Sequence, residues 1–349
     1  MKKMTRAKVR HLTVNIKSKP EFRLAYWDID SGREGPCLLV TAALHGNEVQ
    51  GSEVIRRFCP LAEKKIVKGR MLLIPFANPL AVWNRRPHIV STMANPKGSM
   101  VERLINGKKM LVPDPRDNIN CTWPGNPDGN MAEQMSHALF KGIIEQATHN
   151  IDLHCYNRFW ATAAVPEGEE KAIEFAMAGA YPFVIPGHPV IKTNYNGPYI
   201  LSGWFNANGR TAYSVEFSGQ YSVVEKEVGV GVRALINSSR YLGMFRGKPA
   251  GIEETIVKGP ATRDFTVRAP FEGLFVENGL ATGDFVRKGD LLGHLFSDRN
   301  LRTARILSPS DGYLYAYGRH SNMCDVDLAD MHPYSDRGDT LAVVVSKKC

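Results

Sequence analysis

The sequence has no apolar run that approaches the length of a membrane span, and it has no Cys-x-x-Cys pair. A transmembrane helix needs about 20 consecutive apolar residues, so we expect no membrane partner. The basic start, MKKMTRAKVR, is not followed by the apolar region of a secretory signal. The six cysteines are scattered along the 349 residues, and reduced thiols in a cytoplasmic protein account for them most simply.

Basic residues are in excess but, beyond the N-terminal segment, they are dispersed. The formal net charge of +9 comes from 44 lysines and arginines against 35 acidic residues. Nucleic-acid-binding proteins usually gather their basic residues on one face or stripe, so we expect no nucleic acid partner. A basic protein also attracts anionic small molecules, and the charge fits that interpretation equally well.

From about Glu21 to Leu242, short apolar runs alternate with helix-like segments. Strands are predicted for CLLVTAA, GRMLLIPFANP, HNIDLHC, YPFVIPG and TAYSVEFSG, and amphipathic helices for AEQMSHALFKGIIEQA and EEKAIEFAMAGA. This alternation is typical of an α/β domain with a mixed, mainly parallel sheet flanked by helices, which we assign to residues 1–246. Within it, residues 87–113 are rich in Pro, Gly, Asn and Lys, which predicts a long loop or insertion.

Residues 247–349 change in character and predict a small all-β module. Short apolar strands are punctuated by Gly-Asp turns, without a helical pattern. Two stretches recur weakly: APFEGLF (269–275) is echoed by SPSDGYLY (308–315), and RKGDLLG (287–293) by DRGDTLA (336–342). Two quasi-equivalent halves of short strands indicate a folded-over β-sandwich.

Polar residues gather where the predicted strands end. HGNE, residues 45–48, follows an apolar strand and precedes a helix-like segment, and His154 ends the strand of IDLHCY. Two imidazoles and one carboxylate are a ligand set for catalytic zinc, with the fourth position left to water. Glu216, at the end of the apolar run in TAYSVEFSG, is then the best candidate for a general base.

Each of these residues also has a purely structural interpretation. An isolated His-x-x-Glu occurs often by chance, and a histidine in DLH is as well explained by a hydrogen-bonded position in the core. Four imidazole and carboxyl groups at successive strand ends are much harder to explain as structure alone. Their conjunction favours a metal site made by His45, Glu48 and His154, with Glu216 beside it.

Five motifs, in this order, resemble the succinylglutamate desuccinylase/aspartoacylase family of the zinc-carboxypeptidase-like superfamily. They are HGNE (45–48), NPLAVWNRR (78–86), NINCTWPG (118–125), DLH (152–154) and EFSG (216–219). The resemblance covers roughly residues 35–243, and the C-terminal part resembles the barrel-sandwich module of many bacterial members. It implies hydrolysis of the amide of an N-acyl amino acid or related small amide.

The resemblance also implies roles for individual residues. His45, Glu48 and His154 would bind one zinc ion per chain, and Glu216 would activate water. An arginine after the Asn-Pro turn would stabilise the oxyanion of the tetrahedral intermediate. Arg86 matches that position best, with Arg85 one residue away. The substrate-binding positions of the family correspond to Asn120, Arg85 and Cys121.

The sequence departs from the family at Cys121, where the motif usually has an arginine that grips a substrate carboxylate. Cysteine cannot make that bidentate contact. Either another basic residue replaces it, with Arg116, Arg158 and Arg210 as the possibilities, or the substrate has no carboxylate there. The substrate therefore need not be N-acetylaspartate or N-succinylglutamate. No histidine-based activation is evident for the thiol, so we expect Cys121 to shape the pocket rather than to act as a nucleophile.

Two other classes of protein share some of these features. A metallocarboxypeptidase would use the same zinc ligands, but the missing arginine and the appended β-module argue against it. A biotinyl or lipoyl carrier would have a similar β-module, but a carrier needs a lysine in its hairpin and none lies between Lys288 and Lys347. We expect the module to cover the catalytic domain or to form the interface of a homo-oligomer.

Overall fold

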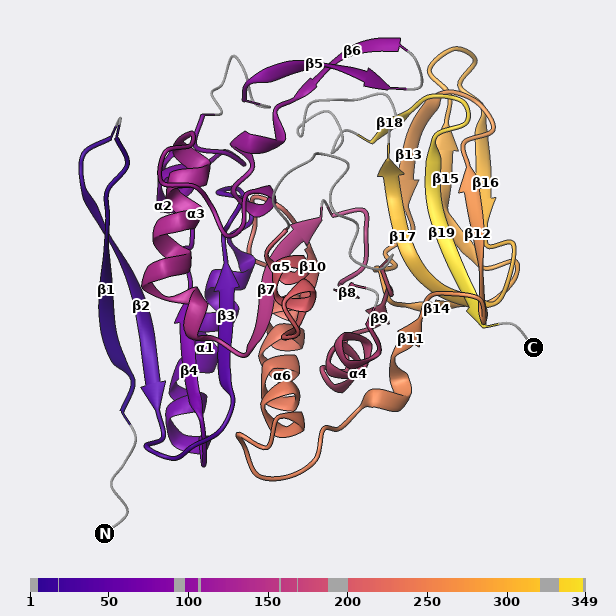
Figure 1. The fold of residues 1–349 in the computed structure, drawn as a ribbon. Coiled ribbons are helices and arrows are strands. Elements are labelled where there is room, and N and C mark those ends of the chain that lie inside the picture. Colours follow the sequence, from indigo (N-terminus) through magenta and orange to yellow (C-terminus); the bar gives the residue numbers. More distant parts are fainter. Residues whose placement is uncertain are drawn as a thin grey trace.

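The computed structural model describes residues 6–17, 19–90, 98–105, 108–156, 158–167, 169–187, 200–320 and 333–347. These residues form a large helix-flanked sheet, followed along the chain by two smaller sheets (Figure 1). The large sheet has the order β1-β2-β4-β3-β7-β10-β8-β9-β11. Its strands are β1 Lys8–Val14, β2 Phe22–Asp30, β3 Cys37–Ala42, β4 Arg70–Ile74, β7 His149–Tyr156, β8 Ala163–Pro166, β9 Phe183–Val184, β10 Thr211–Ser218 and β11 Ile256–Val257.

The large sheet is mixed and mainly parallel, as predicted. Its centre, β4-β3-β7-β10, is parallel throughout, and so are the pairs β8-β9 and β9-β11. The pairs β1-β2, β2-β4 and β10-β8 are antiparallel. Because parallel strands are covered on both faces, they are apolar almost throughout, which is why the sequence marks β3 and β7 so clearly.

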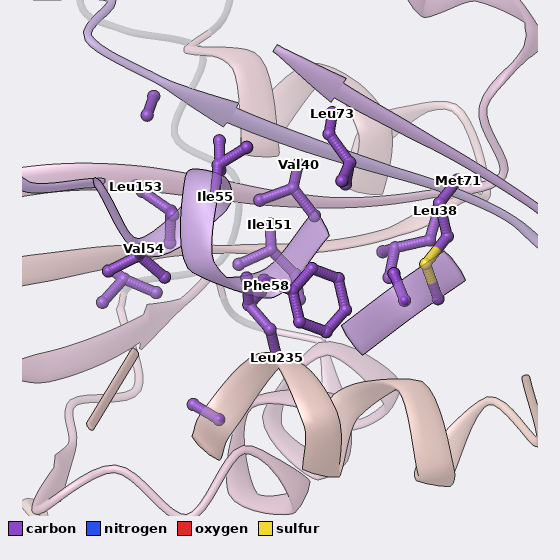
Figure 2. Packing of buried hydrophobic residues seen from close by; sticks show 14 of the residues in the cluster. Leu38, Val40, Val54, Ile55, Phe58, Met71, Leu73, Ile151, Leu153 and Leu235 are labelled. Atoms are coloured by element: carbon purple, nitrogen blue, oxygen red, sulfur yellow. The ribbon is translucent and has the colours of Figure 1, made fainter. Parts of the chain in front are cut away.

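Helices cover both faces of the sheet. They are α1 Gln50–Lys65, α2 Pro79–Asn84, α3 Met131–Gly142, α4 Glu170–Ala178, α5 Leu201–Ala207 and α6 Glu225–Tyr241, with 3-10 turns at Pro115–Asp117, Ile119–Cys121, Ile144–Gln146 and Ile252–Glu254. On one face Val40 and Ile151 of the sheet pack against Phe58 of α1 and Leu235 of α6 (Figure 2). On the other face the alternate strand residue Leu39 joins a core with Leu139 of α3 and Phe205 of α5.

Two predicted elements differ from the structure. The segment 87–113, predicted as a long loop or insertion, contains an antiparallel hairpin that was not predicted, β5 Met100–Ile105 and β6 Lys108–Pro113; residues 91–97 and 106–107 lie outside the described ranges. The overlooked sequence signal is the Asn-Gly dipeptide between two apolar-containing runs, which favours a hairpin. In YPFVIPG only Phe183–Val184 form a strand, since the flanking prolines cannot donate to a ladder.

The C-terminal module consists of two four-stranded antiparallel sheets, and the described residues form no closed barrel. One sheet is β12 Thr262–Arg268, β19 Thr340–Lys347, β17 Gly312–His320 and β14 Phe285–Val286; the other is β16 Thr303–Leu307, β15 Leu291–Phe296, β13 Gly273–Glu277 and β18 Tyr334–Ser335. The two echoed stretches lead into equivalent strand pairs, β13-β15 in one sheet and β17-β19 in the other. The sequence repeat thus corresponds to a repeated pair of strands.

The module packs against the segment that follows β7. The Ala161 N–H donates to the Tyr315 carbonyl and the Tyr317 N–H to the Phe159 carbonyl, both at 2.8 Å. Phe159 and Tyr315 belong to one buried apolar cluster with Val343 of β19. The module therefore covers the α/β domain close to the end of β7. The division at residue 246 remains a prediction, and β11, which follows it, completes the large sheet.

No helix in the described part of the chain combines the length and the apolar character that crossing a membrane requires.

Candidate metal centre

His45, Glu48 and His154 converge at the carboxyl edge of the parallel strands. His45 and Glu48 lie in the turn between β3 and α1, and His154 lies near the end of β7, the neighbour of β3. Carboxyl ends of parallel strands share one edge, where α/β proteins bind ligands. One potential ligand atom from each residue lies within 4.8 Å of the others. The three predicted ligands are therefore brought together.

The turn that carries His45 is held by α2. A Cβ on Gly46 would lie 2.1 Å from the Ala81 carbonyl carbon, so only glycine permits this approach of the turn to the helix. The Gly46 N–H donates to the Pro87 carbonyl. The Asn78 side chain, which caps α2, also donates to the Leu44 carbonyl. The NPLAVW motif thus fixes the backbone beneath the first ligand.

Hydrogen bonds on the outer side of both imidazoles direct their inner nitrogens toward Glu48. Asn118 Oδ1 accepts the Asn120 backbone N–H and lies 2.9 Å from His45 Nε2, so Nε2 must carry the proton. The Asp152 carboxylate likewise accepts a hydrogen bond from His154 Nε2 at 2.8 Å. Both Nδ1 atoms then face Glu48, at 2.9 and 3.0 Å from its two carboxylate oxygens. Partners of this kind commonly set the tautomer of metal-binding histidines.

Asp152 is fully buried and links the site to the sheet. Its second oxygen accepts a hydrogen bond from Thr41 Oγ1 of β3 at 2.7 Å. The Glu48 carboxylate accepts further hydrogen bonds from the Cys155 backbone N–H at 3.1 Å and the Gln220 side chain at 3.3 Å. The candidate ligands are therefore restrained from two strands, β3 and β7, and from the loop that follows β10.

The electrostatics of the cluster favour a bound cation. Burial opposes the ionisation of Glu48, but the charges and hydrogen bonds of His45 and His154 outweigh it and hold its pKa well below the ordinary value. Burial lowers the pKa of His45 and of His154, but Glu48, together with Asp152 at His154, raises both above the ordinary value. Protons on the two imidazoles balance the negative charge of the buried carboxylates. A bound metal ion would supply that positive charge instead of the protons.

Glu216 lies directly beside His154. The two residues are register partners in the parallel pair β7-β10, and Ala163 of β8 flanks Glu216 on its other side. Glu216 is partly buried, and burial raises the pKa of its carboxyl to about 8, the positive charge of His154 opposing this shift. Glu216 thus lies beside the candidate metal ligands, and its role as a general base stays a prediction.

The two arginines after α2 differ in their surroundings. Arg85 is exposed, with its backbone in the left-handed region, and its guanidinium donates to the Trp83 carbonyl. Arg86 is partly buried and is followed by Pro87 and by His88, whose ring meets that of His45 at 5.7 Å between centroids. The chain at Arg86 therefore passes close to the metal cluster. Arg86 thus lies on a segment held beside His45, whereas Arg85 is exposed; a role at an oxyanion stays a prediction for both.

Asn120 and Cys121 lie on the 3-10 turn that faces His154. Asn120 Oδ1 accepts the Leu201 backbone N–H of α5, and its amide nitrogen lies 3.2 Å from His154 Nε2. Burial raises the pKa of the Cys121 thiol to about 11. The thiol is therefore neutral at physiological pH, which supports a pocket-shaping role rather than nucleophilic attack.

The donor set fits zinc. Two imidazole nitrogens and one carboxylate oxygen, each restrained by outer hydrogen bonds, are a donor set of catalytic zinc sites, in which water or substrate would take the remaining position. Without a metal ion, a buried histidine and glutamate pair would stabilise the fold less than apolar side chains of similar volume. The fold and the donor set thus define the class of α/β proteins that have a candidate metal centre at the carboxyl edge of a mainly parallel sheet.

Within that class the chain belongs to the succinylglutamate desuccinylase/aspartoacylase family. The sequence model of the succinylglutamate desuccinylase/aspartoacylase catalytic domain matches residues 34–241. The chain is 21% identical over 270 residues to the N-alpha-acetyl-L-2,4-diaminobutyric acid deacetylase of Halomonas elongata, covering 75% of this chain and 71% of that protein. The family resemblance of the motifs is thereby confirmed.

Solved structures of family members share the fold of almost the whole chain. An aspartoacylase family protein from Mesorhizobium loti superimposes with a TM-score of 0.65 at 20% identity, covering 98% of this chain and 95% of that one. The ectoine utilization protein EutE (DoeB) from Ruegeria pomeroyi gives 0.64 at 17% identity, with the same coverage. The predicted arrangement of an α/β domain and a C-terminal β-module is thus a fold that these proteins also have.

Sequence reasoning missed the residues that orient the ligands. Asn118 and Asp152 lie inside quoted motifs, but no role was assigned to them. Thr41 is the penultimate residue of β3, and Gln220 directly follows the EFSG motif. Their polar character at strand ends was a signal, but only the folded backbone shows which imidazole or carboxylate each one contacts.

Proposed function

We propose that this chain is a zinc-dependent amidohydrolase that removes the acyl group from an N-acyl amino acid or a related small amide. The observation that carries the proposal is the convergence of His45, Glu48 and His154 with Glu216 as the register neighbour of His154. Family membership supports the deacylase class, since the family comprises desuccinylases, aspartoacylases and a deacetylase.

The roles of the residues follow from their positions. Zinc held by His45, Glu48 and His154 would polarise the scissile carbonyl and lower the pKa of a bound water to about 7. Glu216 accepts a proton from the attacking water and returns it to the departing amine, which leaves as a neutral group. Arg86 places a positive charge near the carbonyl oxygen that becomes negative in the transition state.

The substrate is expected to be small and to carry its acyl group on nitrogen. The Halomonas relative is by name a deacetylase of an N-acetylated amino acid, which favours an acetyl group here. Because Cys121 replaces the usual clamp arginine, poor activity is expected on N-acetylaspartate and N-succinylglutamate unless another basic residue supplies the clamp. The described cysteines are free thiols, which supports a cytoplasmic enzyme.

A panel of N-acyl amino acids, assayed for amine release by the zinc-loaded protein, tests the proposal. Turnover of one or more of them, abolished by a chelator and restored by zinc, is the expected result. Cleavage confined to the C-terminal residues of peptides would instead identify a metallocarboxypeptidase. Absence of hydrolysis across a broad panel, with zinc bound, would contradict the deacylase function.

A further inference from the structure

The charge that Cys121 lacks has a candidate replacement elsewhere in the structure. The sequence leaves Arg116, Arg158 and Arg210 as alternatives, and the structure separates them. The inference below rests on the proposed function and concerns how that site recognises its substrate.

Arg116 and Arg210 are already engaged in other interactions. The Arg116 guanidinium donates to both oxygens of Asp114, at 2.7 to 3.1 Å, on the 3-10 turn before the Asn120 motif. The Arg210 guanidinium donates to the Glu145 and Ala147 carbonyls and lies over the ring of Trp204. Arg210 also precedes β10, and thus lies at the opposite end of that strand from Glu216.

Arg158 lies at the correct end of the sheet. It follows His154 by four residues, beyond the carboxyl end of β7, and its carbonyl accepts a hydrogen bond from Ser218 Oγ at 3.4 Å. Ser218 and Glu216 are two residues apart on β10 and therefore point to the same face, about 7 Å apart along the strand. The guanidinium is exposed and forms no ion pair with another described residue.

Arg158 also lines a cavity of about 340 Å³ between the α/β domain and the β-module. Ser218 lies in its wall on the catalytic side, and Glu277 and Tyr317 contribute to its wall from the module. The volume is that of a small metabolite rather than of a peptide. Ser218 places one wall of the cavity about 7 Å along β10 from the proposed base Glu216, a distance comparable to the length of an amino acid.

Arg158 lies in the cavity among both basic and acidic residues. Lys226 adds a second cation to the lining, and Glu227 and Glu277 add two carboxyl groups. Burial raises the pKa of both carboxyls; Arg158 partly offsets this at Glu277, and the Ser218 backbone N–H partly offsets it at Glu227. Arg158 keeps donors free beyond its electrostatic interaction with Glu277. A guanidinium offers the paired donors that bind a carboxylate in a bidentate manner.

We propose that Arg158 replaces the missing clamp arginine and binds a carboxylate of the substrate in the cavity between the catalytic domain and the β-module. The carboxylate is either the α-carboxylate of the amino acid half or the terminal carboxylate of a dicarboxylic acyl group. The module is then part of the binding site, because Glu277 and Tyr317 complete the cavity around the guanidinium.

Matched substrate pairs test this role. An N-acetyl amino acid is compared with its C-terminal amide, and an N-succinyl amine with the corresponding N-butyryl amine, so that each pair differs in one carboxylate. In Arg158→Gln, kcat/KM is expected to fall about 10- to 100-fold for the carboxylate-bearing member of one pair, the usual effect of losing a charge-assisted contact. For the uncharged member, kcat/KM should equal that of the wild type. The pair that is affected shows whether Arg158 binds the α-carboxylate or the carboxylate of the acyl group.

Arg116→Gln is the matched control, because it removes an equivalent charge outside the cavity, and it should behave like the wild type. Arg158→Lys should retain part of the preference. An equal loss on both members of each pair, or an unchanged preference in Arg158→Gln with wild-type zinc content and Tm, would overturn the assignment.

A binding measurement separates this inference from the proposed function. Calorimetric titration of zinc-loaded Glu216→Gln with free amino acids and with succinate requires no turnover. The inference is supported if Glu216→Gln binds one of these carboxylates and the double variant Glu216→Gln/Arg158→Gln does not. This result would support it even if no amide in the panel is hydrolysed. The inference would be contradicted if the double variant bound these carboxylates as well as Glu216→Gln does. It would also be contradicted if neither variant bound any of them.

Discussion

Glu216 and His154 are direct neighbours across two parallel strands, with their Cα atoms paired in the register of β10 and β7. Their side chains therefore point to the same face of the sheet, at the edge where the turn with His45 and Glu48 lies. The proposed base is thus positioned by backbone pairing rather than by a flexible loop. This arrangement allows the metal ligands and the base to be tested separately.

Loss of a ligand histidine should remove the metal. His45→Ala or His154→Ala leaves two protein ligands, too few for a stable zinc site, so metal analysis should show a large loss from one zinc per chain. His11→Ala, an exposed histidine of β1, is the control and should retain wild-type zinc. Wild-type zinc content in both ligand variants would rule out the assignment.

Asp152 should tune zinc affinity without binding zinc. In Asp152→Asn one of the two acceptor oxygens becomes an amide nitrogen, so His154 Nε2 and Thr41 Oγ1 can no longer both donate to the side chain. Zinc affinity is expected to fall about 10- to 100-fold, as for other outer partners of metal-binding histidines. Competition with a chelator measures this. Thr41→Val, which removes only the outer hydroxyl, should have a smaller effect, and an Asp152→Asn affinity equal to wild type would show that His154 is oriented by other contacts.

Glu167 should make stability depend on pH. Burial raises the pKa of its carboxyl from 4.5 to about 7, although the Ser202 hydroxyl partly opposes the shift. The folded state then binds the proton more tightly than the unfolded state, so its stability falls as the pH rises from 4.5 to about 7. Glu167→Gln cannot ionise and should lack this component.

Thermal unfolding of both proteins across that interval, at fixed metal content, checks this expectation. The Tm of Glu167→Gln should rise relative to wild type as the pH increases. A difference in Tm that stays constant with pH would show that Glu167 ionises equally well in the folded and unfolded states.

The sequence predicted the sheet and the convergence of His45, Glu48 and His154 because each depends on local signals. The apolar runs of β3, β7 and β10 end at His45, His154 and Glu216, and parallel strands bring their carboxyl ends together wherever they lie in the sheet. The periodicity of α1 and α3 reflects one buried face each. These features need no knowledge of which distant residues meet.

The sequence could not rank contacts between distant segments. The pairing of Asn118 with His45, 73 residues apart, depends on the backbone path of two 3-10 turns. Arg116, Arg158 and Arg210 look alike in sequence, and only their partners and the cavity distinguish them. The hairpin in 100–113 was overlooked because its Lys and Gly content outweighed its Asn-Gly signal.

The most direct test of the central claim measures zinc content and amine release on the same preparation of Glu216→Gln. An amide side chain cannot accept the proton of the attacking water, whereas it leaves His45, Glu48 and His154 in place. The expected result is one zinc per chain, as in the wild type, and a turnover of the best panel substrate reduced about 10²- to 10⁴-fold. Wild-type turnover by zinc-loaded Glu216→Gln would contradict the account.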